Sequence, residues 1–170
     1  MKKYITTLVW AMMMTIQTMA ADMQYYLAQD NQADCVVTSM ANAHLIFYGD
    51  TLEDAAQMRE QYKFMHQYII EAVGANFSGV KYSNIRTLLK HAGFSPVSVE
   101  CTDTMGMTTL LNQGRFLLGM LYDGAEGHAV RILSVDGDLI QYMDYLAMAE
   151  ASAPCKKFMP VVYGLKKPEF

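Results

Sequence analysis

The chain has 170 residues, of which 52% are hydrophobic and 18% charged, and its formal net charge is −4 at pH 7. This length fits a single domain, and so high an apolar content with so little charge excludes a disordered chain. The 13 lysines and arginines form no basic stripe, so the electrostatic footprint of a nucleic-acid-binding protein is absent from the sequence.

The first twenty residues have the composition of a secretory signal peptide. Lys2 and Lys3 precede an apolar run over residues 4–16, and the small residues Thr18 and Ala20 at the −3 and −1 positions predict cleavage after Ala20, with cleavage after Ala21 as the alternative. The sequence therefore predicts an exported protein, periplasmic or secreted, with one mature domain over residues 21–170. The apolar run is short for a membrane span, so no membrane association is expected after cleavage. An uncleaved amphipathic or anchor helix is the alternative.

Three helices are predicted after an irregular polar lead-in. Apolar residues recur with a 3.6-residue period in the first helix, and Gly49 stands where a C-terminal cap belongs. Thr51 and Asp54 resemble a capping box that opens the second helix, and Ser83 can cap a third helix that Gly93 ends. The expected helices cover residues 35–48, 51–73 and 83–92.

The second half of the chain is rich in strand-forming residues. A short helix is expected over residues 104–112, and Asp136-Gly137 is a hairpin signal between two apolar runs. The expected strands cover residues 96–100, 115–122, 128–135, 139–145 and 158–165. Helices first and an antiparallel sheet second predict an α+β domain.

Three cysteines follow the predicted signal peptide: Cys35, Cys101 and Cys155. An exported protein can form disulfides, but an odd number leaves at least one thiol unpaired. The economical arrangement is a Cys101–Cys155 disulfide with Cys35 free. Two plain buried thiols at these positions are the alternative.

Cys35 stands at the start of the first predicted helix. The unsatisfied N–H groups and the dipole of a helix N-terminus favour a negative charge there, and the thiolate is the reactive form of cysteine. Gln29 lies six residues upstream in a polar loop, where its amide can donate a hydrogen bond to an oxyanion. A small buried residue at a helix start is the simpler interpretation of Cys35 taken alone.

His128 opens a predicted strand directly after a glycine-flanked turn, and Asp144 lies on the strand that returns from the next hairpin. If Asp136-Gly137 forms the turn, the expected register puts Asp144 opposite or near Ala129, one residue from His128. Cross-strand neighbours approach closely enough for a carboxylate to orient an imidazole and fix its tautomer.

Together, Gln29, Cys35, His128 and Asp144 occur in an order that resembles the C39-type branch of the papain-like cysteine peptidases. Residues 110–119 also look like the helix and strand that lead up to the histidine of that family. The resemblance implies a papain-like fold with N-terminal helices packed on a C-terminal antiparallel sheet. The signal peptide and the lack of a transporter segment match the stand-alone, exported type.

The resemblance also implies a role for each residue. Cys35 is the expected nucleophile, and His128 is the general base and then the general acid. Asp144 orients His128, and Gln29 is the oxyanion donor. The implied substrate is a peptide or protein, and the implied hydrolysis passes through a thioester without a cofactor.

Two positions depart from the family pattern. Val36 replaces the glycine that often follows the cysteine and could narrow the approach to sulfur, and Tyr145 replaces the proline that usually follows the aspartate. An inactive peptide-binding or immunity-type module on the same fold therefore stays an alternative. So does a transglutaminase-like or amidase-like thiol acyl transferase, although Gln29 favours a peptidase.

The remaining histidines give no metal-binding pattern. No two of them share a ligand spacing with a cysteine or a carboxylate. His44 lies on the apolar face of the first helix and is expected to be a hydrogen-bonded core histidine, and His66 and His91 belong to helix faces. We expect neither a metal nor another cofactor.

Overall fold

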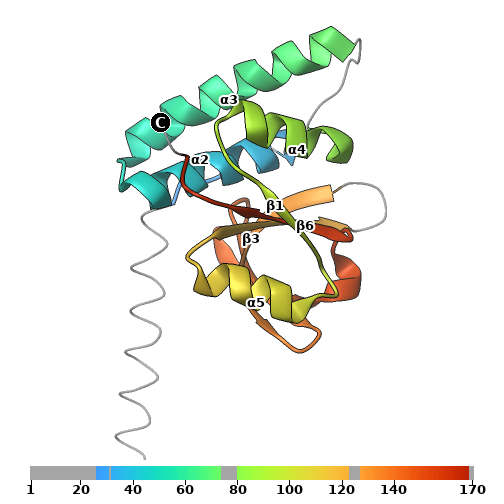
Figure 1. Ribbon diagram of the computed structural model, residues 1–170. Coiled ribbons are helices and arrows are strands. Elements are labelled where there is room, and N and C mark those ends of the chain that lie inside the picture. Colours follow the sequence, from blue (N-terminus) through green and yellow to red (C-terminus); the bar gives the residue numbers. More distant parts are fainter. Residues whose placement is uncertain (1–25, 31, 74–79, 123–126, 169–170) are drawn as a thin grey trace, which may run out of the picture.

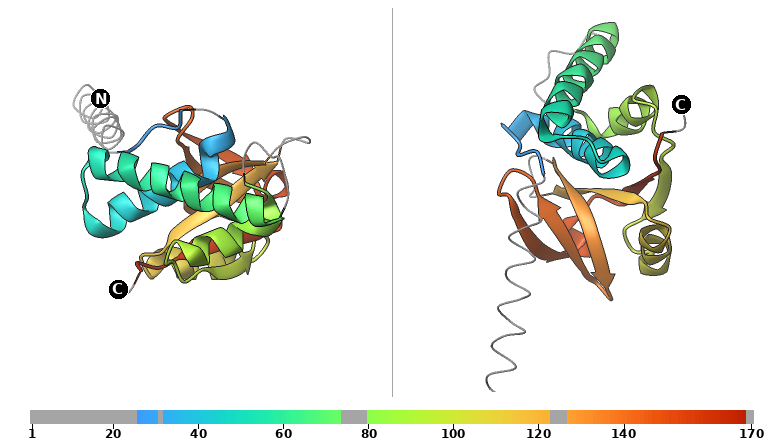
Figure 2. Two further views of the ribbon diagram at one scale, coloured as in Figure 1. Left: turned by 90° about the horizontal axis from the view of Figure 1, so that it is seen from above. Right: turned by 90° about the vertical axis from the view of Figure 1, so that its left-hand side faces the viewer.

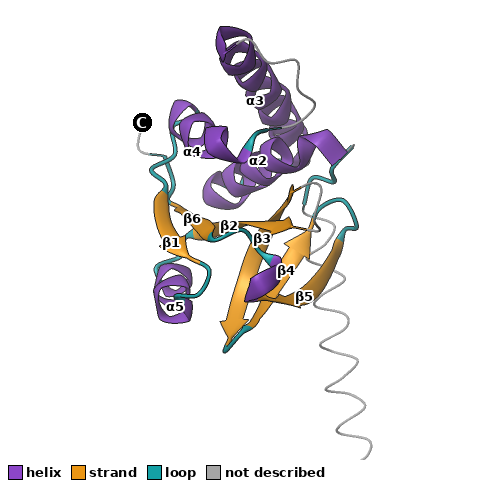
Figure 3. Ribbon diagram, turned by 90° about the vertical axis from the view of Figure 1, so that its right-hand side faces the viewer, coloured by secondary structure: helices purple, strands orange, loops and turns teal. Residues whose placement is uncertain are grey.

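The structure is a computed structural model that describes residues 26–30, 32–73, 80–122 and 127–168. A sheet separates two helical layers, with α2, α3 and α4 on one face and α5 on the other (Figure 1 and Figure 3). The elements follow the order η1 (Gln32–Asp34), α2 (Cys35–Tyr48), α3 (Leu52–Val73), α4 (Tyr82–His91), β1 (Val97–Glu100), α5 (Thr104–Asn112), β2 (Phe116–Tyr122), β3 (Gly127–Asp136), β4 (Leu139–Asp144), β5 (Ala149–Pro154), η2 (Cys155–Lys157) and β6 (Val161–Leu165). The predicted α+β class is confirmed.

Helix α2 is the central element, and it lies between α3 and the sheet (Figure 2). Its first nine residues are all buried, which is the burial expected for a helix covered on two sides. It ends at Gly49, whose φ of 68° is the left-handed conformation that glycine adopts at little cost. The predicted limits of this helix are therefore confirmed.

Helix α3 begins at the predicted capping box. The Thr51 hydroxyl accepts a hydrogen bond from the Asp54 N–H at 3.2 Å, and the Asp54 carboxylate accepts one from the Thr51 N–H at 3.0 Å. The predicted cap of α4 is wrong, because that helix begins at Tyr82 and Ser83 is already inside it. The N-cap is Lys81, two residues before Ser83, and the Tyr82 hydroxyl exchanges two hydrogen bonds with the backbone of Val161 in β6, which anchors the start of the helix.

The six strands of the described part of the chain form one antiparallel sheet in the order β1-β6-β2-β3-β4-β5. Strand β5 was not predicted, because its sequence of alanine, glutamate, serine and proline has a low β propensity. It pairs with β4 over six positions at the edge of the sheet. Strand β5 is therefore held by main-chain pairing with β4. The turn that joins β4 to β5 contains Met148, whose φ is 48°.

Both faces of the sheet are buried, so consecutive residues of one strand enter different cores. In β2, Leu118 packs with the helices α2 and α4, whereas Leu117 packs with α5 on the opposite face. In β3, Ala129 and Val130 divide in the same way. This double burial explains the nearly unbroken apolar sequence of β2.

Cys101 and Cys155 lie together in the core beneath α5, but both are free thiols. The predicted disulfide is not formed, and the Cys101 thiol instead donates a hydrogen bond to the Cys155 carbonyl oxygen at 3.6 Å. Burial and the neighbouring Cys155 thiol raise the pKa of Cys101, which keeps it protonated at neutral pH.

The predicted signal peptide lies outside the described residues. Within the part of the chain that the structure does describe, no helix combines the length and the apolar character needed to cross a bilayer.

Candidate active site

Cys35 is the first residue of α2, and the residue is 6% exposed. The N-cap residue Asp34 makes no capping hydrogen bond to the helix, because its carboxylate pairs with Lys63 of α3 at 2.8 Å. The sulfur therefore lies at a helix N-terminus whose partial positive charge favours an anion. The sequence-based placement of Cys35 at this helix start is confirmed.

His128 in β3 and Asp144 at the end of β4 are in direct contact. The Nε2 atom of His128 lies 2.9 Å from the Oδ1 atom of Asp144. The same carboxylate oxygen accepts hydrogen bonds from the N–H groups of Leu146 at 2.9 Å and Ala147 at 3.2 Å. The turn after β4 therefore fixes the carboxylate that in turn holds the imidazole.

The register between the two strands differs by one residue from the prediction. Arg131 pairs with Met143, and this pairing places Asp144 beside Val130 instead of Ala129. The difference arises from the two-residue turn and from a β-bulge between Ile132 and Ser134. His128 and Asp144 meet as diagonal neighbours on one face of the sheet, within reach of their side chains.

The ring of His128 is hydrogen-bonded to both Cys35 and Asp144. Burial by itself lowers the pKa of His128, but the two hydrogen bonds and the negative charges of these partners outweigh burial and raise the pKa to about 9. An imidazole between a thiol and a carboxylate is suited to accept and return a proton.

Asp144 is ionised at neutral pH. Burial raises the pKa of its carboxyl group, but the hydrogen bond to His128 and the backbone N–H groups of Ala147 and Leu146 have the larger combined effect. The pKa of Asp144 is therefore below its ordinary value. A fixed negative charge beside Nε2 stabilises the imidazolium form of the ring.

Gln29 is buried, and it lies in the irregular segment that precedes α2. Its backbone N–H donates to the Tyr145 carbonyl oxygen at 2.9 Å, directly after Asp144 in the chain. The Asn42 side chain, in α2, accepts from the Leu27 N–H at 2.8 Å and donates to the Leu27 carbonyl at 2.9 Å. These contacts join the Gln29 segment to both α2 and the end of β4.

The two departures from the family pattern are accommodated by the core. Val36 is fully buried and belongs to the cluster between the helices and the sheet. Tyr145 is also buried, and its ring makes an edge contact with Tyr26 at 5.8 Å between centroids. Because its carbonyl oxygen accepts the Gln29 N–H, Tyr145 helps to fix the lead-in segment.

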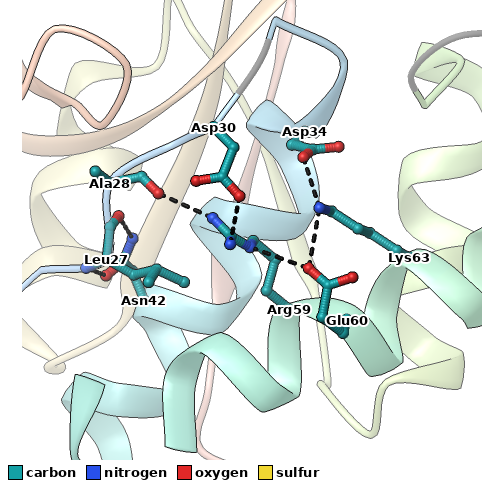
Figure 4. Close-up of polar contacts among 8 residues, drawn as sticks. All are labelled: Leu27, Ala28, Asp30, Asp34, Asn42, Arg59, Glu60 and Lys63. Atoms are coloured by element: carbon teal, nitrogen blue, oxygen red, sulfur yellow. Dashed lines mark hydrogen bonds and ion pairs between the residues drawn. The ribbon is translucent and has the colours of Figure 1, made fainter. Parts of the chain in front are cut away.

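Sequence reasoning missed the contribution of α3. Arg59 donates to the Ala28 carbonyl oxygen at 3.0 Å and pairs with Asp30, so it contacts both neighbours of Gln29 (Figure 4). Lys63 lies one turn further along α3 and pairs with Asp34. The only signal in the sequence is the four-residue spacing of two basic residues on a helix, which does not reveal their partners.

Two of the other histidines, His44 and His91, have local partners. The Nδ1 atom of His44 lies 2.8 Å from Asp50, and its ring stacks on Tyr48, as expected for a hydrogen-bonded histidine at the edge of the core. His91 is exposed and contacts the Thr87 carbonyl oxygen, and the side chain of His66 lies outside the described part. Among the residues that the structure describes, no three His, Cys, Asp or Glu side chains form a group that could hold a metal ion.

Comparison with known proteins gives a structural match. No protein-family model and no curated protein matches the sequence. The structure is similar to the crystal structure of the peptidase domain of Streptococcus ComA, a bifunctional ABC transporter involved in a quorum-sensing pathway. The match has a TM-score of 0.52 and 15% sequence identity, and it covers 85% of this chain and 99% of that domain.

The fold is that of a papain-like cysteine peptidase. The fold predicted from the resemblance is thus confirmed, since the mixed architecture and nearly the whole length of the ComA domain are matched. At 15% identity the comparison bears on the fold and leaves the activity to be argued from the residues of this chain.

Proposed function

We propose that this chain is a cysteine peptidase that hydrolyses peptide bonds through a thioester on Cys35. The observation that carries the proposal is the position of His128, whose ring is hydrogen-bonded to both Cys35 and Asp144. A nucleophile, a base and a group that orients the base are the three components of a catalytic triad. The papain-like fold supports the same assignment.

Because His128 is protonated at neutral pH, we assign the thiol proton of Cys35 to its ring, and in the first step the Cys35 thiolate attacks the carbonyl carbon of the scissile peptide bond. Asp144 stabilises the resulting imidazolium through its contact with Nε2. His128 then gives the proton to the leaving amine as the C–N bond breaks, and the acyl group stays on sulfur as a thioester.

In the second step, water replaces the amine. His128 takes a proton from the water molecule, the hydroxide oxygen attacks the thioester carbonyl, and the C–S bond breaks to release a carboxylic acid and leave the Cys35 thiolate beside the protonated His128. Both tetrahedral intermediates carry a negative oxygen. We assign its stabilisation to the Gln29 amide and the backbone N–H of Cys35, because the Gln29 segment is joined to both α2 and the end of β4.

Site-resolved alkylation by iodoacetamide from pH 4 to 9 tests the proposed nucleophile and base. We expect Cys35 to react rapidly below pH 7, and we expect this reactivity to collapse in His128→Ala. The buried thiols of Cys101 and Cys155 are internal controls for unfolding. A Cys35 that titrates like a free thiol near pH 8.5, or that reacts in neither protein, contradicts the proposal and favours a binding module on a peptidase fold.

A library of peptides then defines the substrate, which we propose to be a peptide or protein met outside the cytoplasm. Cleavage at a peptide bond supports a peptidase. Incorporation of an added primary amine in place of water identifies a transglutaminase-like transferase instead. Detection of a mature N-terminus close to residue 21 on the exported protein tests the proposed signal peptide.

A further inference from the structure

We propose that Arg59 is a positioning residue that holds the oxyanion donor Gln29 in place from helix α3. This inference rests on the proposed function, because it concerns how the donor of that site is fixed. Arg59 makes no contact with the reacting atoms in this assignment, and its effect passes through the backbone on the two sides of Gln29 (Figure 4).

The first argument is the lack of regular structure around Gln29. Residues 26–30 belong to no helix or strand, so their position depends on contacts with other elements. Asn42 holds Leu27, and Tyr145 accepts the backbone N–H of Gln29. Arg59 adds the contacts at Ala28 and Asp30, which are the residues directly before and after Gln29.

The second argument is the placement of the cation itself. The Arg59 side chain is nearly buried, whereas its carboxylate partner Asp30 is largely exposed. A buried charge is costly unless hydrogen bonds compensate for the lost water, and an aliphatic side chain would serve packing alone at least as well. A planar guanidinium, in contrast, can contact a carbonyl oxygen and a carboxylate at the same time, which fixes the direction of the chain between them.

The third argument is that α3 fixes the nucleophile from the same face. Lys63, four residues after Arg59, pairs with Asp34 next to Cys35. Residues four apart lie side by side on a helix. The rigid helix therefore sets the separation between the Gln29 segment and the start of α2, which is the separation that an oxyanion site must hold constant.

The test compares two reactions of the same thiol. Iodoacetamide alkylates Cys35 by displacement at a saturated carbon, so no oxyanion forms. With p-nitrophenyl acetate, the sulfur attacks the ester carbonyl, a C–S bond forms, and the C–O bond breaks to release p-nitrophenolate through a tetrahedral oxyanion. Only the second reaction needs Gln29. The rate of p-nitrophenolate release with the Cys35→Ala variant measures the background reaction of the other side chains.

Arg59→Lys keeps the positive charge, but an ammonium group cannot reproduce the two simultaneous contacts of the guanidinium with the Ala28 carbonyl oxygen and the Asp30 carboxylate. We expect it to slow acylation by about 10- to 100-fold, as a misplacement on the order of 1 Å does, and to leave alkylation within about twofold. Gln29→Ala should slow acylation by about 10²–10³-fold with alkylation again unchanged. Arg115→Lys is the matched control, because Arg115 also donates to a backbone carbonyl, that of Gly164, on the far strand β6.

The double variant decides whether Arg59 acts through Gln29. In the Gln29→Ala background, Arg59→Lys should slow acylation by less than about twofold further, because the donor that it positions is gone. An equal loss with and without Gln29 overturns the inference, and so does an equal loss of alkylation and acylation, which indicates a general structural effect. If wild-type Cys35 is not acylated above background, the proposed function itself fails and the inference fails with it.

Discussion

Replacing Asp144 with asparagine should lower the pKa of His128 markedly. In the wild-type protein this pKa is about 9, because hydrogen bonds and negative charges from Cys35 and Asp144 outweigh the effect of burial. Asparagine keeps the size of the side chain and an acceptor oxygen for Nε2, but it removes the charge. The change in pKa therefore isolates the electrostatic contribution of one carboxylate.

The magnitude follows from Coulomb's law. Two unit charges about 4 Å apart attract by about 1 kcal/mol in water and by about 4 kcal/mol at an effective dielectric constant of about 20. The side chains of His128 and Asp144 are 25% and 21% exposed, so an intermediate value of about 2 kcal/mol is appropriate. This free energy corresponds to about 1.5 pH units, so we expect the variant to titrate near pH 7.5.

The assay is a pH titration of histidine side chains by ¹H–¹⁵N NMR from pH 5 to 10.5. His128→Ala identifies the His128 resonance by its absence. Asp50→Asn is the matched control, because it removes a carboxylate from the other described histidine–aspartate pair, that of His44. A wild-type midpoint near the ordinary value of 6.5, or a change below about 0.3 units in Asp144→Asn, would refute this account of the site.

Three further predictions concern stability. Leu118→Ala should lower the free energy of unfolding by about 2–5 kcal/mol in urea denaturation, because Leu118 is fully buried. Leu139→Ala, at a position 45% exposed, should lower it far less. Equal effects of the two substitutions would contradict the assigned core. Thr51→Ala removes the cap of α3 and should cost about 0.5–2 kcal/mol, and an unchanged urea midpoint would count against the capping box. The pKa of His128 is raised in the folded state, so protonation of His128 stabilises the fold fully below about pH 6.5, and this stabilisation is lost as pH rises through 9. The difference in free energy of unfolding between wild type and His128→Ala should therefore shrink by about 1–2 kcal/mol over that range. A constant difference would refute the linkage.

Local patterns predicted the elements that carry the site. The 3.6-residue period and Gly49 gave both ends of α2, so the placement of Cys35 at a helix start followed from the sequence. The Asp136-Gly137 signal gave the β3–β4 hairpin that brings His128 and Asp144 together. These features depend on interactions between residues that are close in the chain, so a local pattern of residues is enough to predict them.

Other features depend on partners that are distant in the chain. The one-residue error in register came from a turn at residues 137–138, which shifts the pairing by two residues, and from a β-bulge that reverses the shift by one. Strand β5 exists through its pairing with β4. Cys101 and Cys155 were rightly expected to be neighbours, but their covalent state was not encoded in their spacing. Packing and pairing across the sheet decided each of these outcomes.

The sequence by itself determined the helical first half, the strand-rich second half and the identity of the candidate catalytic residues. The tertiary structure alone decided how these residues are held. Arg59 and Lys63 reach from α3 to the Gln29 segment and to Asp34 over about thirty residues of chain. A side chain's contacts over such separations follow from the packing of whole helices and strands, which no local pattern of residues records.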